Sequence, residues 1–230
     1  YDVLAGQVPT FGLADSGSTS AYVSVQGSTN FAAGGTVIIR TGISLGSGSQ
    51  YIDLRYLTFS NAAYGISING ANSIRISEVG VFGAGTAFDV QGNSQNILLD
   101  RCVGANGTLG LRVSGSRAVF TRGVLWDNAE AGVRADTGSA ILSNSVIAAS
   151  GVRAYAYYAG TATNILGNYN CLYARDDALM GFLANSGQNV DTHSAWIHAT
   201  SSERRSLEDN PLFAASTNMF DFHEMTELVQ

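Results

Sequence analysis

Lysine is absent from this 230-residue chain, so all twelve of its basic residues are arginine. Charged residues of both signs make up only 13% of the chain, and its formal net charge is −6. A nucleic-acid-binding protein needs a basic patch to meet the phosphate backbone, and this sparse, acidic composition has none to offer. The composition therefore predicts no nucleic-acid partner.

The chain is also poor in cysteine and in long apolar runs. Cys102 and Cys171 are too few to form a disulfide framework. If the chain stacks in turns, as argued below, they lie three turns apart at inward positions. That separation of roughly 14 Å is too far to bridge, so both are predicted to be buried free thiols. No run of about 18 apolar residues occurs, so we expect no membrane span.

What the chain does contain is one short segment repeated with small changes. Copies begin at residues 52, 74, 97, 118 and 140, so the segment recurs every 21 to 23 residues. A sixth copy at residues 164–167 follows after 24 residues, counted from Leu142 to Leu166. Self-similarity at a fixed period of this length is the mark of a stacked-repeat architecture.

Each repeat contains two or three short runs with apolar residues at every second position, which is the period of a half-buried strand. Gly, Asn, Ser and Asp stand at the joints and tolerate tight-turn backbone angles. No stretch keeps a capped 3.6-residue apolar period, so helices are not the unit. We therefore predict an all-β, single-stranded parallel β-helix of about 22 residues per turn and eight to nine turns.

Three inward columns carry this prediction. They are Ile66/Phe88/Leu111/Val133, Leu54/Ile76/Leu99/Phe120/Leu142 and Phe59/Val81/Leu125/Ile147. With these columns the chain resembles the right-handed parallel β-helix superfamily that contains pectate lyases and many bacterial surface proteins. The resemblance is strong over residues 20–175 and implies a right-handed fold, an acidic polysaccharide as partner, and an exported bacterial protein that is secreted or held at the cell surface.

The repeats divide one predicted domain, residues 1–230, into three parts. Residues 1–50 form irregular first turns, 51–173 the regular repeats, and 174–230 lengthened last turns with an aromatic closing segment. Residues 174–180 are expected to form a long turn or a short helix. The chain begins abruptly at Tyr1, without a signal-peptide pattern, and solenoids need covered ends. We therefore expect a mature or trimmed piece of a longer protein.

Residues between inward positions face solvent, and their columns suggest a site. The outward column of the first strand in each turn reads Ser67, Asp89, Arg112, Arg134 and Tyr157, and the turns before these strands lengthen along the chain. This inventory predicts an extracellular protein that binds an acidic polysaccharide or degrades it as a lyase-like enzyme. Paired guanidiniums would hold the carboxylate of a uronic acid, and a lyase also needs a base that takes the C5 proton and an acid that protonates the leaving oxygen. The predicted catalytic residues are Arg112, Arg134 and Tyr157. The predicted substrate-binding residues are Asp89, Trp126, Asp127, Glu130, Asp136, Arg153, Tyr173, Arg175 and Asp177.

A second interpretation treats the same charges as structural. Asp89 next to Arg112, and Arg134 next to Asp136 and Glu130, are what a solvated parallel sheet needs to balance its charges across turns. The lyase base supplied by lysine in some relatives is missing, and so are the motifs of polygalacturonases and epimerases. The alternative is a non-catalytic structural or adhesive module of a surface protein or filament.

Two further features complete the predictions. No metal site is predicted. The adjacent Asp176 and Asp177 are expected either to begin a turn or to bind calcium through their carboxylates. Outward aliphatic residues form a patch that soluble monomers usually avoid. We expect a terminal segment, a neighbouring domain or another copy to cover its members, which are Leu98, Val119, Ile141 and Ile165.

Overall fold

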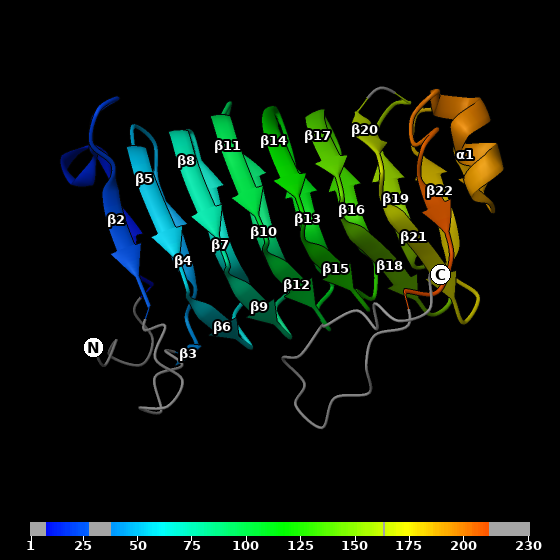
Figure 1. Cartoon of the computed structure of the whole chain (residues 1–230), viewed down its shortest axis with the longest axis horizontal. Coiled ribbons are helices and arrows are strands. Elements are labelled where there is room, and N and C mark those ends of the chain that lie inside the picture. Colours follow the sequence, from blue (N-terminus) through cyan, green and yellow to red (C-terminus); the bar gives the residue numbers. More distant parts are fainter. Residues whose placement is uncertain (1–7, 28–37, 163, 212–230) are drawn as a thin grey trace, which may run out of the picture.

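The repeated segments form β-strands that stack turn upon turn, as the computed structural model in Figure 1 shows. The structure describes residues 8–27, 38–162 and 164–211. Over this part the chain is an all-β parallel β-solenoid with three sheets and about six turns of about 23 residues each. The predicted solenoid is confirmed, but it has fewer turns than the eight to nine expected, because the segments at both ends add short strands without completing regular turns.

Each turn contributes one strand to each of three long sheets. Sheet 1 consists of β1 (Thr10–Phe11), β4 (Ile43–Leu45), β7 (Tyr64–Asn69), β10 (Thr86–Gln91), β13 (Leu109–Val113), β16 (Ala131–Ala135), β19 (Tyr155–Ala159), β22 (Leu179–Leu183) and β23 (Gln188–Val190). Sheet 2 consists of β2 (Val23–Gln26), β5 (Gln50–Arg55), β8 (Asn72–Ser77), β11 (Gln95–Asp100), β14 (Ser116–Thr121), β17 (Gly138–Ser143) and β20 (Ile165–Asn168). Sheet 3 consists of β3 (Ile38–Ile39), β6 (Thr58–Ser60), β9 (Gly80–Phe82), β12 (Val103–Ala105), β15 (Val124–Trp126), β18 (Val146–Ser150), β21 (Cys171–Arg175) and β24 (Leu207–Glu208).

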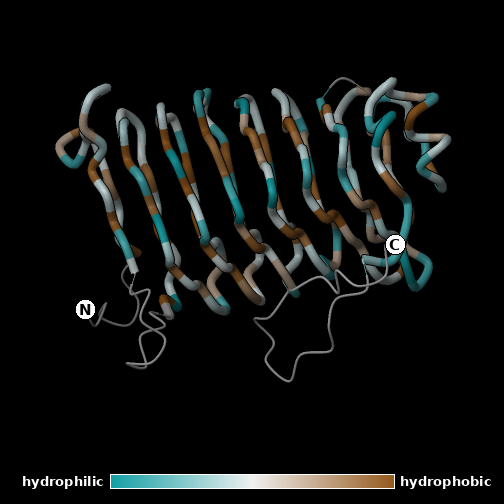
Figure 2. Tube along the Cα trace, viewed as in Figure 1, coloured by the Kyte–Doolittle hydropathy of each residue, from teal (hydrophilic) through white to brown (hydrophobic). Residues whose placement is uncertain are grey.

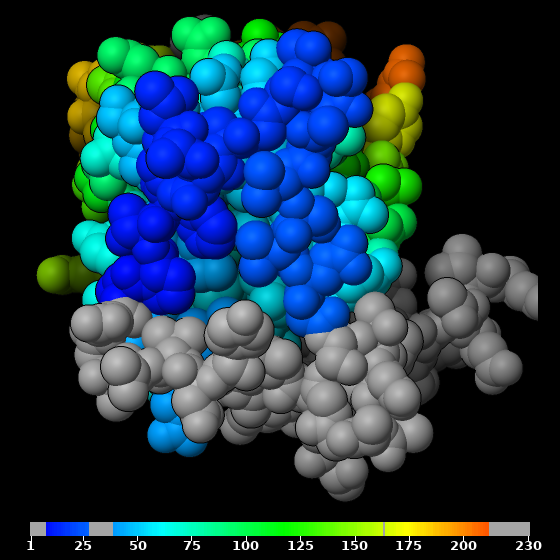
Figure 3. All heavy atoms as spheres, turned by 90° about the vertical axis from the view of Figure 1, so that its left-hand side faces the viewer, coloured from blue at the N-terminus to red at the C-terminus, as the bar shows by residue number. Residues whose placement is uncertain are grey.

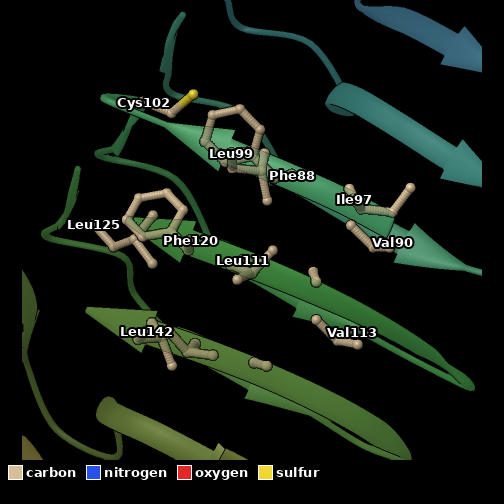
Figure 4. Packing of buried hydrophobic residues seen from close by; sticks show 14 of the residues in the cluster. Phe88, Val90, Ile97, Leu99, Cys102, Leu111, Val113, Phe120, Leu125 and Leu142 are labelled. Carbon is tan, nitrogen blue, oxygen red and sulfur yellow. The ribbon is translucent and has the colours of Figure 1, made fainter. Parts of the chain in front are cut away.

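The interior is filled by the predicted inward columns. Phe88, Leu111 and Val133 follow one another in sheet 1 and are 0% exposed. Phe120 of sheet 2 meets Phe88 across the core, with ring centroids 6.4 Å apart (Figure 4). Hydrophobic and hydrophilic residues alternate along each turn (Figure 2), because successive side chains of a strand point to opposite faces.

The register follows the predicted period until the turns lengthen. Ala140 pairs with Ile165, an offset of 25 residues rather than the 24 expected. Asn164 explains the extra residue, because its Oδ1 accepts a hydrogen bond from Thr161 Oγ1 at 2.8 Å and holds a local turn. Ile165 is therefore buried in the core and Leu166 points outward with 43% of its surface exposed. The prediction that Ile165 faces outward is wrong by one position.

A similar shift moves the tyrosines of β19. The chain uses nine residues from Val146 to Tyr155 but only seven from Val124 to Ala131, the equivalent positions one turn earlier. Arg134 consequently pairs with Tyr158, and Tyr157 continues the inward column below Val133. The predicted outward position of Tyr157 is wrong.

The C-terminal end is closed by a helix that the sequence did not predict. Residues 176–178 form only a short turn before β22, and β23 then pairs antiparallel with β22. Helix α1 (His193–Thr200) follows, and its Trp196 is fully buried against Tyr157, with ring centroids 5.1 Å apart. The predicted aromatic closing segment at residues 209–223 lies outside the described residues except for residues 209–211.

At the N-terminal end, β1, a 3₁₀ turn (Leu13–Asp15) and β2 make up the turn that faces the viewer in Figure 3. Phe11 and Val25 pack against the core while remaining partly exposed. Neither cysteine forms a disulfide within the described residues. Cys102 is fully buried, whereas Cys171 is only partly buried, less than predicted. Burial raises the pKa of the Cys102 thiol to about 12, so this thiol stays protonated.

Candidate functional site

The predicted strip on the outer face of sheet 1 is a network of ion pairs. Arg112 Nε lies 3.3 Å from Asp136 Oδ2, and Arg112 Nη1 lies 3.8 Å from Asp89 Oδ1. Arg134 Nε donates to Asp136 Oδ1 at 2.7 Å, and its Nη1 pairs with Glu130. Asp136 thus bridges the two arginines, and we call these five residues the sheet 1 charge network. Register places Asp89, Arg112 and Arg134 on three successive strands, as predicted.

The members of the network differ in burial and in the causes of their pKa shifts. Asp89 is only 1% exposed, and Gln91 Nε2 donates to its Oδ2 at 3.1 Å. Burial raises the pKa of Asp89, while Arg112 counteracts this rise and Asp136 adds to it. For Arg134 burial lowers the pKa, but Asp136 and Glu130 outweigh burial and the pKa is raised. Arg134 therefore remains a cation whose charge is already balanced.

The third predicted catalytic residue does not reach this surface. Tyr157 is 0% exposed and donates its hydroxyl hydrogen to Glu203 Oε1 at 2.8 Å inside the solenoid. Burial and the Glu203 carboxylate raise its pKa well above the usual value, so Tyr157 is a poor proton donor to substrate or base. Tyr158 takes the outward place, where its ring lies 4.5 Å from the Arg134 guanidinium.

Most of the predicted turn residues gather in a second group at the corner between sheets 3 and 1. Trp126 and Tyr173 stack with centroids 6.2 Å apart, although two turns separate them. They meet because the intervening turn carries Ala148, which is buried. Arg175 reaches over the same turn to pair with Asp127. The predicted convergence of Trp126, Asp127, Tyr173 and Arg175 is therefore observed.

Arg153 and Asp177 stand apart from both groups. Both are exposed in turns that precede β19 and β22, and neither forms an ion pair within residues 8–27, 38–162 and 164–211. Asp176 lies 3.5 Å from Arg175 Nη1. Across the described chain no cluster of three or more His, Cys, Asp or Glu side chains has a geometry that could hold a metal ion.

Sheet 2 carries a hollow that the sequence reasoning missed. It occupies about 320 Å³ over strands β5, β8 and β11. Three residues from each strand and the corner that follows it form its walls, and we call this feature the sheet 2 hollow. Its lining residues are Asp53, Arg55, Tyr56, Arg75, Ser77, Glu78, Leu98, Asp100 and Arg101. The outward positions of the second strand in each repeat place these charges side by side.

The backbone at the corner between sheets 2 and 3 turns the rim of this hollow outward. Tyr56, Glu78 and Arg101 all adopt left-handed angles, with φ of 54°, 55° and 51°. Their amides still donate to the next turn, as Glu78 N does to Asp100 O at 3.0 Å. A left-handed residue ends the strand sharply, so the three side chains form a ridge along one side of the hollow.

The outward aliphatic column lies beside the hollow on the same sheet. Its members are Leu98, Val119, Ile141 and Leu166, the last replacing Ile165. Leu98 is 37% exposed, and Val119 and Ile141 are half-buried. That another copy or domain covers this column stays a prediction.

Compared with known proteins, the chain matches no family model, no curated protein and no solved structure. In the described part of the chain, no helix has the length and apolar character needed to cross a bilayer.

Proposed function

We propose that this chain is a non-catalytic structural or adhesive β-solenoid module of a secreted or cell-surface protein. One observation carries the proposal: the two arginines predicted to hold a substrate carboxylate, Arg112 and Arg134, already pair with carboxylates of the protein itself. Charge balance across turns removes the like-charge repulsion that stacking would otherwise create. The sheet 1 charge network therefore stabilises the stacking of neighbouring turns.

The same geometry argues against the interpretation of the chain as a polysaccharide lyase. A lyase on an uronic acid needs free cations for the carboxylate together with a base and an acid near the reacting carbon. Substrate would have to displace Asp136 from both arginines, and Tyr157 is not within reach. A hydrolase needs two carboxylates that flank the scissile bond. Glu130 and Asp136 are both engaged by Arg134.

The proposal extends to the winding of the solenoid. Connections between consecutive parallel strands of one sheet are right-handed in the great majority of proteins. Together with the resemblance in the inward columns, this supports a right-handed helix of the pectate-lyase-like kind. The acidic polysaccharide partner, in this view, is bound and not cleaved.

Incubation with pectin, alginate and glycosaminoglycans tests the proposal. Lyase action creates an unsaturated uronate, which accumulates as ultraviolet absorbance. We expect no increase above a protein-free blank for the native chain, with or without added calcium. Steady product formation that disappears in both Arg112→Ala and Arg134→Ala would overturn the proposal and restore the catalytic role of the sheet 1 charge network.

A further inference from the structure

The sheet 2 hollow exists because a small residue stands at the centre of a ring of long ones. Ser77 pairs in register with Arg55 on one side and Asp100 on the other, and Arg75 and Glu78 flank it along the chain. Neighbouring strands are about 4.8 Å apart, so the hydroxymethyl group of Ser77 leaves a depression that the surrounding side chains cannot fill.

One cation in this ring has no anionic partner. Arg55 pairs with Asp53, Arg101 pairs with Glu78 at 2.8 Å, and Arg122 binds Asp100 through both of its carboxylate oxygens. Arg75 is the exception: within the described residues no carboxylate oxygen lies within 4.0 Å of its guanidinium. Its guanidinium instead rests 4.2 Å from the centre of the Tyr22 ring, which positions the group without cancelling its charge.

One acceptor in the hollow also lacks a partner. Asp53 is 3% exposed and gives one carboxylate oxygen to Arg55. Its other oxygen, Oδ1, is buried and has no hydrogen-bond donor in the described chain. An ionised carboxylate only accepts hydrogen bonds, and a buried acceptor without a donor is costly. Asp53 also lines the hollow, so a rotation of its carboxylate toward a ligand hydroxyl would give this oxygen a donor and remove that cost.

We propose that the sheet 2 hollow binds the acidic unit of a polysaccharide, a hexuronate, with Arg75 holding its carboxylate and Asp53 accepting from a neighbouring hydroxyl. A hexuronate carries both groups on one ring. Leu98 and Tyr56 supply apolar surface for the ring itself. The volume of about 320 Å³ is at the lower end of ligand pockets, in keeping with one sugar unit of a longer chain. This site lies on a different sheet from the predicted catalytic strip.

Two sugars that differ in one group test the assignment. Methyl β-D-glucuronide and methyl β-D-glucoside differ only in the carboxylate, and each is titrated into the ¹⁵N-labelled chain while amide shifts are followed. We expect saturable shifts at Ser77, Leu98 and their neighbours with the glucuronide, and at least tenfold weaker binding of the glucoside. Equal shifts with sodium acetate would mean an adventitious ion only and would overturn the proposal, as would the absence of saturable shifts.

Variants locate the binding site. Arg75→Gln removes the charge and keeps a shorter, polar side chain, and Ser77→Tyr fills the depression. Each should weaken glucuronide binding about tenfold or more. Arg117→Gln is the matched control, because Arg117 is an exposed arginine on the same sheet outside the hollow, and it should leave binding unchanged. Equal loss in Arg117→Gln would point to diffuse charge attraction and contradict the site. The absorbance assay reports on cleavage alone, so the two proposals fail separately.

Discussion

Replacing Trp196 by alanine should lower the free energy of unfolding by about 3–5 kcal/mol, the range for large aromatic residues removed from a core. Trp196 is fully buried and packs against Tyr157 at the last turn, with the two ring planes tilted by 39°. It also occupies the space above Gly181, where an added Cβ would lie 2.4 Å from indole Cζ3. Urea denaturation followed by circular dichroism measures the loss.

Two companion variants sharpen this prediction. Trp196→Phe should cost much less, because it retains an aromatic ring and removes an indole Nε1 that is buried without a hydrogen-bond partner in the described chain. Gly181→Ala should destabilise the native protein and be better tolerated in the Trp196→Ala background, where the clash with the indole is gone and only a 3.2 Å contact with Tyr157 O is left. If the two losses in free energy of unfolding were additive in that double-mutant cycle, Trp196 of α1 would not pack against Gly181 at the end of the inward column.

Replacing Glu203 by alanine should cost about 3 kcal/mol, because it leaves several buried donors without an acceptor. Glu203 is 0% exposed, and its carboxylate accepts from Tyr157 Oη at 2.8 Å and from Asn170 Nδ2 at 3.0 Å. Ser206 also donates to it. Asn170 continues the arrangement into the preceding turn by accepting from Ser145 N at 3.0 Å. The carboxylate therefore terminates a buried polar ladder, and urea denaturation reports its loss.

Tyr157→Phe provides the comparison for this cluster. It removes one donor and leaves Glu203 with Asn170 and Ser206, so we expect a loss of about 1 kcal/mol. If Glu203→Ala lowered the free energy of unfolding no more than Tyr157→Phe does, the Glu203 carboxylate would be dispensable for the stability of the last turn.

Sequence periodicity predicted the stack because the core columns impose it. A shift of one residue in a strand would move its side chains from the core to the solvent. Because the core tolerates only one register, Ile74, Ile97 and Ala118 could be aligned without coordinates. The same rule explains the two errors. Before Tyr157 and before Ile165 the turns absorb extra residues, and aromatic or aliphatic side chains on both sides of the slip give no signal of which one points inward.

The site was harder to predict than the fold, for physical reasons. Register alone places Asp89, Arg112 and Arg134 on one face, but whether these groups bind each other or a ligand depends on side-chain conformations. Helix α1 escaped prediction because only one of its residues, Trp196, is buried, so it has no apolar stripe. The hollow on sheet 2 was within reach, since Asp53, Arg75 and Leu98 follow one another in register.

We propose that the arginines of sheet 1 help to hold the stack together. The most direct test compares the free energies of unfolding of Arg134→Ala and Arg153→Ala. Arg134 has three partners on the outer face, Asp136, Glu130 and Tyr158, whereas Arg153 is exposed and without an ion pair in the described chain. We predict a loss of about 1–2 kcal/mol for Arg134→Ala and none beyond error for Arg153→Ala. Equal stability of the two variants would contradict the account.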